Sequence, residues 1–326
     1  MATVFEADFR HALHYENVLG AIDALYRCGN EIEKALALFE AESKSIRAAH
    51  SWVETHAHES EAVSELCGRY PNTGRYVISA WLHPRDRVRW LEAALAASKR
   101  LGNRRAERAH LVNLGSSYSE LGQVDHAVKL FEEALSLAGE LGNGSAEGNA
   151  WGNLGSAYLR LGQHDRALEF YERRLAFTRA RGDRRGEAHA LGNIGIVQRK
   201  LGNTQSAIEY HYLDLKIARE IGDRLGEGMA LGNLGACYRI LGDPWRALEF
   251  HRRRLTIARE ISDRGGEAAG LFNSGLALLD LGKPAEALTN VRAALQIFQQ
   301  LEDPNAAKAT RLIAKLKNRT AVRSGS

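Results

Sequence analysis

Apolar residues recur at helical spacing along the first part of the chain. Between residues 5 and 28 they are Phe9, Leu13, Val18, Ile22 and Leu25, and between 32 and 53 they are Ile32, Leu36, Phe39, Ile46 and Trp52. Most of these residues are three, four or seven positions apart, which places them on one face of a helix that must pack against neighbours. The pattern predicts helices at 5–28 and 32–53, a third near 59–69 that ends before Pro71, and a fourth near 74–82 that ends before Pro84. Residues 1–83 are therefore expected to form an N-terminal helical bundle or cap.

A tetrapeptide repeats through the rest of the chain. It reads Val-Asn-Leu-Gly at 112–115, Gly-Asn-Leu-Gly at 152–155, Gly-Asn-Ile-Gly at 192–195, Gly-Asn-Leu-Gly at 232–235 and Phe-Asn-Ser-Gly at 272–275. Its asparagines, here called the ladder asparagines, are 40 residues apart each time: Asn113, Asn153, Asn193, Asn233 and Asn273. A fixed period in this range indicates stacked supersecondary units rather than one globular core.

Each unit reads as two helices. The first carries the tetrapeptide and ends at a Leu-Gly pair, glycine being favoured just past a helix end. The second carries a recurrent alanine, and the Asp or Asn that closes the unit can cap the next helix. The second glycine of the tetrapeptide is expected to serve contact between helices. We expect a degenerate half repeat at 84–103, five full repeats over 104–303, a capping helix at 304–317 and a disordered tail at 318–326.

Charge, cysteine content and apolar runs exclude some classes of protein but do not identify a binding partner. The net charge of +4 over 326 residues is small, so no nucleic-acid partner is required. The three cysteines form no disulfide framework, which favours a reducing compartment. No secretion signal begins the chain, and no run approaches the ~20 apolar residues needed to span a bilayer. The sequence favours a cytoplasmic protein without membrane contact.

The sequence lacks the motifs that mark nucleotide-binding and catalytic sites. No phosphate loop, nucleophile elbow or H-E-x-x-H pattern occurs, so we expect no enzyme, no catalytic residue and no cofactor. His50, His56, His58 and Glu54 match no strong metal-ligand spacing, and solvated histidines are the simpler interpretation. The run Arg252-Arg253-Arg254 falls on a second helix expected to face outward, and acidic neighbours interrupt it, which argues against nucleic-acid binding.

The repeat pattern resembles the tetratricopeptide repeat over about 85–317. The resemblance rests on Leu111, Trp151, Leu191, Leu231 and Leu271 early in the first helices, on the Leu-Gly that follows in most units, and on the alanines of the second helices. The usual unit has 34 residues. The longer form looks like the repeats of LGN/Pins-type polarity adaptors and of many bacterial repeat proteins. The resemblance implies an all-α, right-handed superhelical solenoid of antiparallel helix pairs, with the first helices lining a concave face.

A second, weaker resemblance concerns the N-terminal part. Phe9-Arg-His, Ala37-Leu-Phe, Trp52 and the stretch at 82–95 look like the segment that joins the ATPase core to the repeats in bacterial signal-transduction NTPases of the STAND/NB-ARC type. The nucleotide-binding core is missing, so ATP binding is not implied. What the resemblance implies is a sensor or docking arm.

If the first helices line a groove, the ladder asparagines form a row along it. A side-chain amide offers one acceptor and two donors, which match the C=O and N–H of an extended peptide backbone. Gly152, Gly192 and Gly232, each before an asparagine, would let a ligand approach closely. The alternative for the asparagines is bonding to a neighbouring helix, which would brace the stack.

The flanking positions of the same helices are mostly basic. One turn after the asparagines lie Arg160, Arg199, Lys200 and Arg239, and one turn before Asn193 lies His189. Such a groove favours acidic side chains or a peptide carboxylate, although a solvated helix edge is the alternative. We therefore expect a module that binds a protein or peptide partner, and a homo-oligomer is compatible with the sequence. The second hypothesis is a regulatory subunit that docks a separately encoded NTPase or effector through its N-terminal helices.

Overall fold

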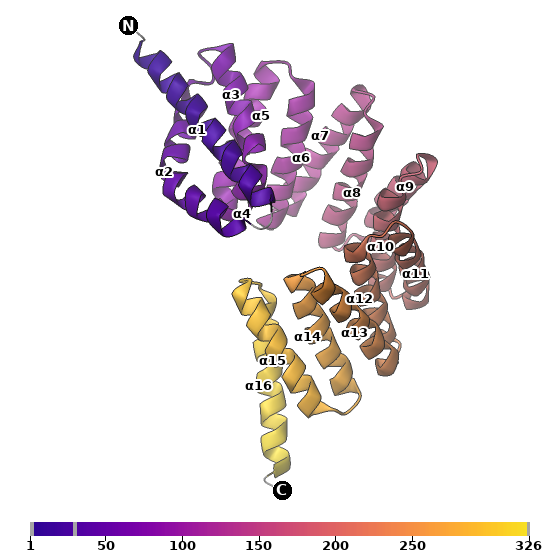
Figure 1. Ribbon diagram of the computed structural model, residues 1–326. Helices are drawn as coiled ribbons and strands as arrows, with labels where there is room; N and C mark the ends of the chain where they lie inside the picture. The colour runs from indigo at the N-terminus through magenta and orange to yellow at the C-terminus, as the bar shows by residue number, and fades with distance from the viewer. Residues whose placement is uncertain (1–2, 29–30, 325–326) are drawn as a thin grey trace. The chain divides into compact units, whose positions relative to one another are not determined.

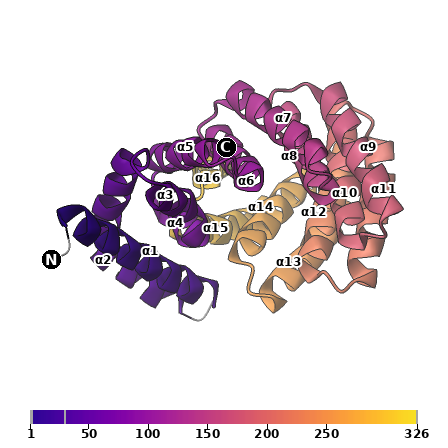
Figure 2. The same cartoon turned by 90° about the horizontal axis from the view of Figure 1, so that it is seen from above.

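The computed structural model describes residues 3–28 and 31–324, with side chains described as far as Leu316. Within those residues all the regular elements are helices (Figures 1 and 2). The chain divides into two compact units, Met1–Gln163 and His164–Ser326. In each unit, helices that follow one another along the chain pack as pairs. The expected all-α class and stacked helix pairs are confirmed.

The first unit holds eight helices in its described part. They are α1 (Val4–Arg27), α2 (Ile32–His56), α3 (Glu61–Thr73), α4 (Arg75–Trp81), α5 (Pro84–Arg100), α6 (Arg104–Glu120), α7 (Val124–Glu140) and α8 (Gly144–Arg160). Helix α1 packs against α2, α3 against α5, and α6 against α7. Residues 29 and 30, expected to end the first helix, lie outside the described residues.

Helix α3 differs from its expected end. It continues through Pro71 to Thr73 instead of stopping near residue 69. Contacts with α1 stabilise this last turn, because the Tyr70 hydroxyl donates to the Ala12 carbonyl at 2.7 Å and the Thr73 hydroxyl to Glu16 at 2.6 Å. Tertiary contacts thus outweigh the bond that proline removes.

Helix α5 packs against α3. Its Trp90 and Ala97 lie in the same buried cluster as Leu66 and Tyr70 of α3. The helix pair that precedes the regular repeats is therefore α3 with α5, with the short α4 between them.

The second unit holds the other eight helices of the described chain. They are α9 (His164–Ala180), α10 (Arg184–Lys200), α11 (Thr204–Glu220), α12 (Arg224–Ile240), α13 (Pro244–Glu260), α14 (Arg264–Asp280), α15 (Pro284–Gln300) and α16 (Asn305–Ser324). The pairs α10/α11, α12/α13 and α14/α15 pack closely, and α16 covers α15. Helix α16 runs past the expected end at residue 317. The tail expected at 318–326 is thus helical as far as Ser324, where alanine and arginine are good helix formers; residues 325 and 326 lie outside the described residues.

The turns between the helices use the expected residues. Gly182 and Gly222 adopt φ values of 66° and 69°, which close the preceding helix in the left-handed conformation that glycine allows. Asp183 and Asp223 then accept the backbone N–H of Gly186 and Gly226, both at 2.9 Å, and cap the next helix. None of the described helices has the length and apolarity needed to cross a bilayer.

The second glycine of the tetrapeptide lies where two paired helices meet. A Cβ at Gly115 would lie 2.6 Å from the Phe131 ring, and one at Gly195 would lie 2.6 Å from the His211 ring. Gly235 meets His251 in the same way. The expected role in contact between helices is confirmed, because only glycine leaves room for the ring.

Candidate functional site

The ladder asparagines hold the same position on the first helix of each full repeat. Asn113 and Asn153 lie on α6 and α8 of the first unit, and Asn193, Asn233 and Asn273 lie on α10, α12 and α14 of the second. All five are half-buried. No hydrogen bond joins a ladder side-chain amide to any described residue. The amides therefore do not brace the helix stack in this structure.

Arginine and glutamate side chains at the starts of the first helices connect neighbouring helices instead. On α10, Glu187 accepts from Arg184 at 2.6 Å and from Arg179 of α9 at 2.9 Å, and Arg184 also pairs with Glu220 of α11. Burial alone would raise the pKa of Glu187, but the hydrogen bonds from Arg179 and Arg184 lower it below the ordinary value.

The same cluster recurs one repeat later. On α12, Glu227 accepts from Arg224 at 2.6 Å and from Arg219 of α11 at 2.8 Å, and Arg224 also pairs with Glu260 of α13. In both repeats the cluster joins three successive helices. These ion pairs connect neighbouring helices without the ladder asparagines.

The first glycines of the tetrapeptide accommodate charged side chains from the paired helix. A Cβ at Gly192 would lie 2.7 Å from the Asp214 carboxylate on α11, and one at Gly232 would lie 2.9 Å from Arg254 Cδ on α13. Where the tetrapeptide begins with Val112 or Phe272, the matching residue of the second helix is a buried alanine, Ala134 or Ala294. The space at Gly192 and Gly232 is therefore occupied by the chain's own side chains. Close approach of a ligand at these glycines stays a prediction. Gly152 is buried as well.

Asp214 is the charged residue that lies behind Gly192. It is 7% exposed and forms no hydrogen bond or ion pair with the described residues. Burial, with the nearby Asp223 carboxylate, raises the pKa of Asp214 to about 7. A carboxylate in this position loses its hydration and gains no partner in return.

A pocket of about 210 Å³ opens in front of Asp214. It is lined by residues of α10, α11 and α12 with the turn before α12: His189, Gly192, Asn193, Ile196, Asp214, Asp223, Leu225, Gly226, Met229 and Asn233. The pocket thus brings together four residues expected at the site: His189, Gly192, Asn193 and Asn233. Burial and the nearby Arg174 lower the pKa of His189, which favours its neutral form.

The expected basic residues lie elsewhere. Arg199, Lys200 and Arg239 do not line the pocket. Arg239 pairs with Asp280 of α14 at 3.2 Å, Lys200 is exposed, and Arg199 is half-buried. Arg160 is exposed at the end of α8 in the first unit. The acidic residues that line the pocket are Asp214 and Asp223, and the expected basic character of the groove stays a prediction.

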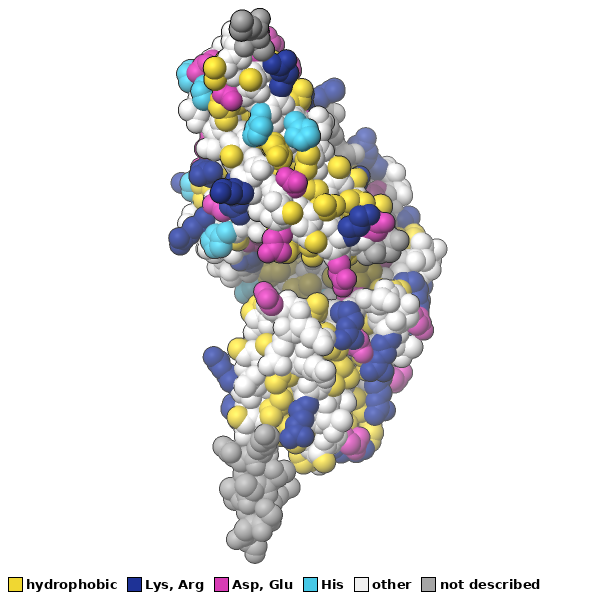
Figure 3. All heavy atoms as spheres, turned by 60° about the vertical axis from the view of Figure 1, so that its left-hand side comes forward, with side chains coloured by type: hydrophobic (Ala, Val, Ile, Leu, Met, Phe, Trp, Pro, Cys, Tyr) yellow, Lys and Arg dark blue, Asp and Glu magenta, His cyan; other side chains and the backbone are white. Residues whose placement is uncertain are grey.

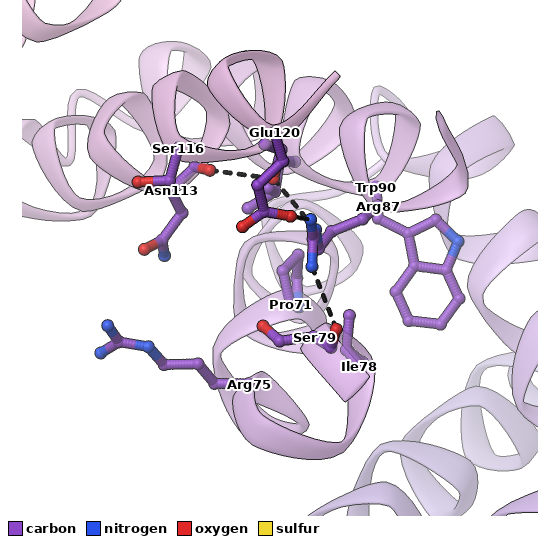
Figure 4. Close-up of a pocket in the computed structure, with 11 residues that line it drawn as sticks. Pro71, Arg75, Ile78, Ser79, Arg87, Trp90, Asn113, Ser116 and Glu120 are labelled. Atoms are coloured by element: carbon purple, nitrogen blue, oxygen red, sulfur yellow. Dashed lines mark hydrogen bonds and ion pairs between the residues drawn. The ribbon is translucent and has the colours of Figure 1, made fainter. Parts of the chain in front are cut away.

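The first unit has a smaller pocket beside Asn113, of about 140 Å³ (Figure 4). There the buried Arg87 donates to the Ser117 hydroxyl at 3.1 Å, to the Ser79 carbonyl at 3.2 Å and to Glu120. These bonds satisfy Arg87 within the fold. The Arg75 guanidinium points away from the Arg87 cluster, as Figure 4 shows.

Sequence reasoning missed Asp214 because second helices were expected to face outward. The sequence contained a usable signal in the sizes of the residues at matching positions of the two helices. A glycine in the first helix matches a long or charged residue in the second. The same oversight affects the arginine run at 252–254: Arg252 and Arg253 are exposed, but Arg254 is half-buried against Gly232.

The histidines of the N-terminal helices pack with aromatic rings. His50 is buried and stacks on Trp90 with ring centroids 3.9 Å apart, and His56 stacks on Trp52 at 4.7 Å. Figure 3 shows histidine side chains spread over the surface of this part of the molecule. The residues that the structure describes contain no group of three or more His, Cys, Asp or Glu that could hold a metal ion.

Comparison with known proteins identifies the repeat. The family model described as tetratricopeptide repeat matches residues 107–180, 146–213 and 186–260 in overlapping copies. A search of curated proteins found no match. Solved structures with the same fold are numerous, and their low sequence identities make them informative about the fold alone.

Three of these structures cover nearly the whole chain. A STAND protein with a tetratricopeptide repeat sensor from Pyrococcus horikoshii is 15% identical, with a TM-score of 0.61 over 93% of this chain and 47% of its own. Aspartyl phosphate phosphatase F from Bacillus subtilis is 10% identical, with a TM-score of 0.64 over 98% and 95%. The apo form of the quorum sensor NprR from B. thuringiensis is 17% identical, with a TM-score of 0.58 over 92% and 80%. The repeats over residues 107–260 are tetratricopeptide repeats.

Proposed function

We propose that this protein binds an extended segment of a protein or peptide partner along the ladder asparagines. The observation that carries the proposal is that Asn193 and Asn233 are half-buried, have unpaired side-chain amides and line one pocket. An amide that is partly withdrawn from water and unpaired gains most from a ligand that supplies both a donor and an acceptor. The backbone of an extended peptide supplies both at each residue.

The magnitudes set a limit on what the ladder contributes. At ~1 kcal/mol net for each amide, the three ladder amides of the second unit contribute ~3 kcal/mol, whereas micromolar affinity needs ~8 kcal/mol. Side-chain contacts must therefore add to the backbone bonds. Arg160 and Lys200, exposed on the same first helices, favour acidic residues in the partner. A cytoplasmic location, expected from the cysteines, stays a prediction.

The proposal is tested with a randomised peptide mixture passed over immobilised protein, with bound peptides read by mass spectrometry. The double variant Asn193→Ala, Asn233→Ala should lose roughly 30-fold in affinity for the peptides that the wild type retains, at ~1 kcal/mol for each amide. The matched control is Asn203→Ala, Asn290→Ala, which removes two amides outside the ladder. Equal retention by the ladder variant, with unchanged helicity and melting temperature, would refute the proposal.

A second candidate function is docking through the N-terminal helices. The fold likeness to the STAND protein favours it, because that likeness extends over 93% of this chain and so includes most of these helices. Partner capture from native lysate separates the two candidates. A partner held through the first helices should be lost on Val4→Glu, a side chain that is 80% exposed, and kept by the ladder variant.

A further inference from the structure

Asp214 combines burial with the lack of a partner in the pocket that Asn193 and Asn233 line. It is 7% exposed, forms no bond with the described residues, and reaches the pocket through the gap at Gly192. The same position in two other repeats is a buried alanine, Ala134 or Ala294. The fold therefore does not need a carboxylate there.

The other acidic residue of the pocket is already engaged. Asp223 accepts the Gly226 N–H at 2.9 Å and pairs with Arg185 at 3.4 Å. Asp214 is thus the carboxylate that remains to be satisfied. Asn193 and Asn233 add two side-chain carbonyl acceptors to the same space, and His189 adds a ring nitrogen.

The walls between the mouth and Asp214 are apolar. Ile196 is half-buried on α10, and Leu225 and Met229 are 52% and 54% exposed on α12. A pocket with apolar walls and an acceptor at its end matches a side chain with a methylene stem and a charged tip. Lysine and arginine have that form. A free carboxylate would meet the Asp214 charge and be repelled.

We propose that this pocket binds the arginine or lysine side chain of the bound peptide, with the cationic tip donating to the Asp214 carboxylate. The proposal rests on the peptide-binding function above and adds a residue class that the ladder alone does not select. The Asn193 and Asn233 carbonyl oxygens have two lone pairs each, so beside a backbone N–H they can accept the remaining N–H donors of the tip. Ile196, Leu225 and Met229 contact the stem. The partner is thus expected to carry a basic residue at one fixed position.

The test uses small probes rather than an unidentified partner. Met229 lines the pocket, and the only other methionine is Met1, so ¹³C-methyl labelling of methionine gives one internal reporter. The labelled protein is titrated with N-acetyl-arginine methylamide, with the lysine equivalent, and with N-acetyl-citrulline methylamide, which has a similar shape and no charge. The variants are Asp214→Asn and Asp214→Ala, the second being the residue found in other repeats. The control is Glu249→Gln, which removes one exposed negative charge on α13 outside the pocket.

We expect the arginine or lysine probe to shift the Met229 signal to saturation in the wild type and in Glu249→Gln. The citrulline probe should bind the wild type about tenfold more weakly than the cationic probes do. Both Asp214 variants should bind the cationic probes about tenfold more weakly than the wild type does, as the loss of a hydrogen bond to a charged group implies. Equal binding of the citrulline probe, equal binding by the Asp214 variants, or no shift with either cationic probe would overturn the proposal.

This result is separable from that of the peptide mixture. Peptides retained through the ladder without response to the cationic probes would refute the cation pocket alone. Response to the probes without retention of peptides would refute the ladder function alone.

Discussion

Asp214 and Gly192 illustrate how one pair of residues on neighbouring helices shapes a pocket. The glycine costs roughly 0.5–1 kcal/mol relative to alanine in the middle of a helix, and the carboxylate behind it is buried without a partner. Both features reduce the stability of the folded chain. Unpaired buried charges with a shifted pKa are concentrated at functional sites, because a ligand can supply the missing partner.

The raised pKa of Asp214 predicts how stability depends on pH. In the folded chain the pKa is about 7, against the ordinary value of 3.8 for an aspartate in water. The folded chain keeps a proton that the unfolded chain releases between these values, so this residue makes the fold less stable as pH rises through that window. Asp214→Asn should therefore be more stable than the wild type at about pH 8, by on the order of a few kcal/mol, and equal to it near pH 4.

Urea unfolding of the two proteins at both pH values measures this difference. Asn203→Ala, a polar change outside the pocket, controls for unrelated effects of substitution. A variant that is less stable than the wild type at about pH 8 would mean that the Asp214 carboxylate has a stabilising partner in the fold.

At the scale of the element, the helix pairs are held by complementary side chains rather than by one repeated contact. Gly195 and Gly235 face the rings of His211 and His251, whereas Gly115 faces Phe131. Burial lowers the pKa of His211 and of His251 to about 4, with neighbouring arginines adding to the effect. Both rings are therefore neutral in the fold near pH 7.

This arrangement predicts loss of stability in acid. The unfolded chain takes up a proton on His211 near the ordinary histidine pKa of 6.5, while the folded chain does so only near 4, so stability falls as pH drops from about 6.5 to 4. His211→Phe places a phenylalanine ring against Gly195, as Phe131 lies against Gly115. This variant should lose less stability than the wild type as the pH drops from about 6.5 to 4. Melting curves at pH 7 and about pH 5 test this, with the exposed His58→Ala as control. Equal losses in His211→Phe and wild type would show that His211 does not titrate as inferred.

Helix boundaries were the part of the fold most accessible from sequence. The Leu-Gly pairs and the closing Asp or Asn mark them by local backbone chemistry, which needs no tertiary information. The exceptions lie where tertiary contacts decide, as at Pro71, which α3 includes because Tyr70 and Thr73 bond to α1.

The candidate site was only partly accessible from sequence. The row of Asn193 and Asn233 follows from the period, but Asp214 comes from a different helix and reaches the pocket only because Gly192 has no side chain. Such a contribution depends on how two helices pack. Periodicity within one helix carries no information about it.

At the scale of the whole molecule, the repeats keep the ladder asparagine but differ in the residues that face each other beside it. Val112 and Phe272 face alanines, Gly192 faces an acid and Gly232 faces a base, while the ladder asparagine is the same each time. A constant residue suits the constant part of a ligand, which is the peptide backbone. The varied residues suit its side chains. The central claim is therefore that the ladder amides bond to peptide backbone.

The most direct measurement of that claim is a double-mutant cycle that combines the Asn233→Ala variant of the protein with changes in the backbone of the peptide. The peptide retained most strongly from the randomised mixture is made again with one backbone amide at a time replaced by an ester, which removes a single N–H donor. Dissociation constants are measured by calorimetry for wild type and variant. The account predicts one position where the ester weakens wild-type binding several-fold but barely affects the variant, a coupling of ~1 kcal/mol. Additive effects at every position would contradict the claim.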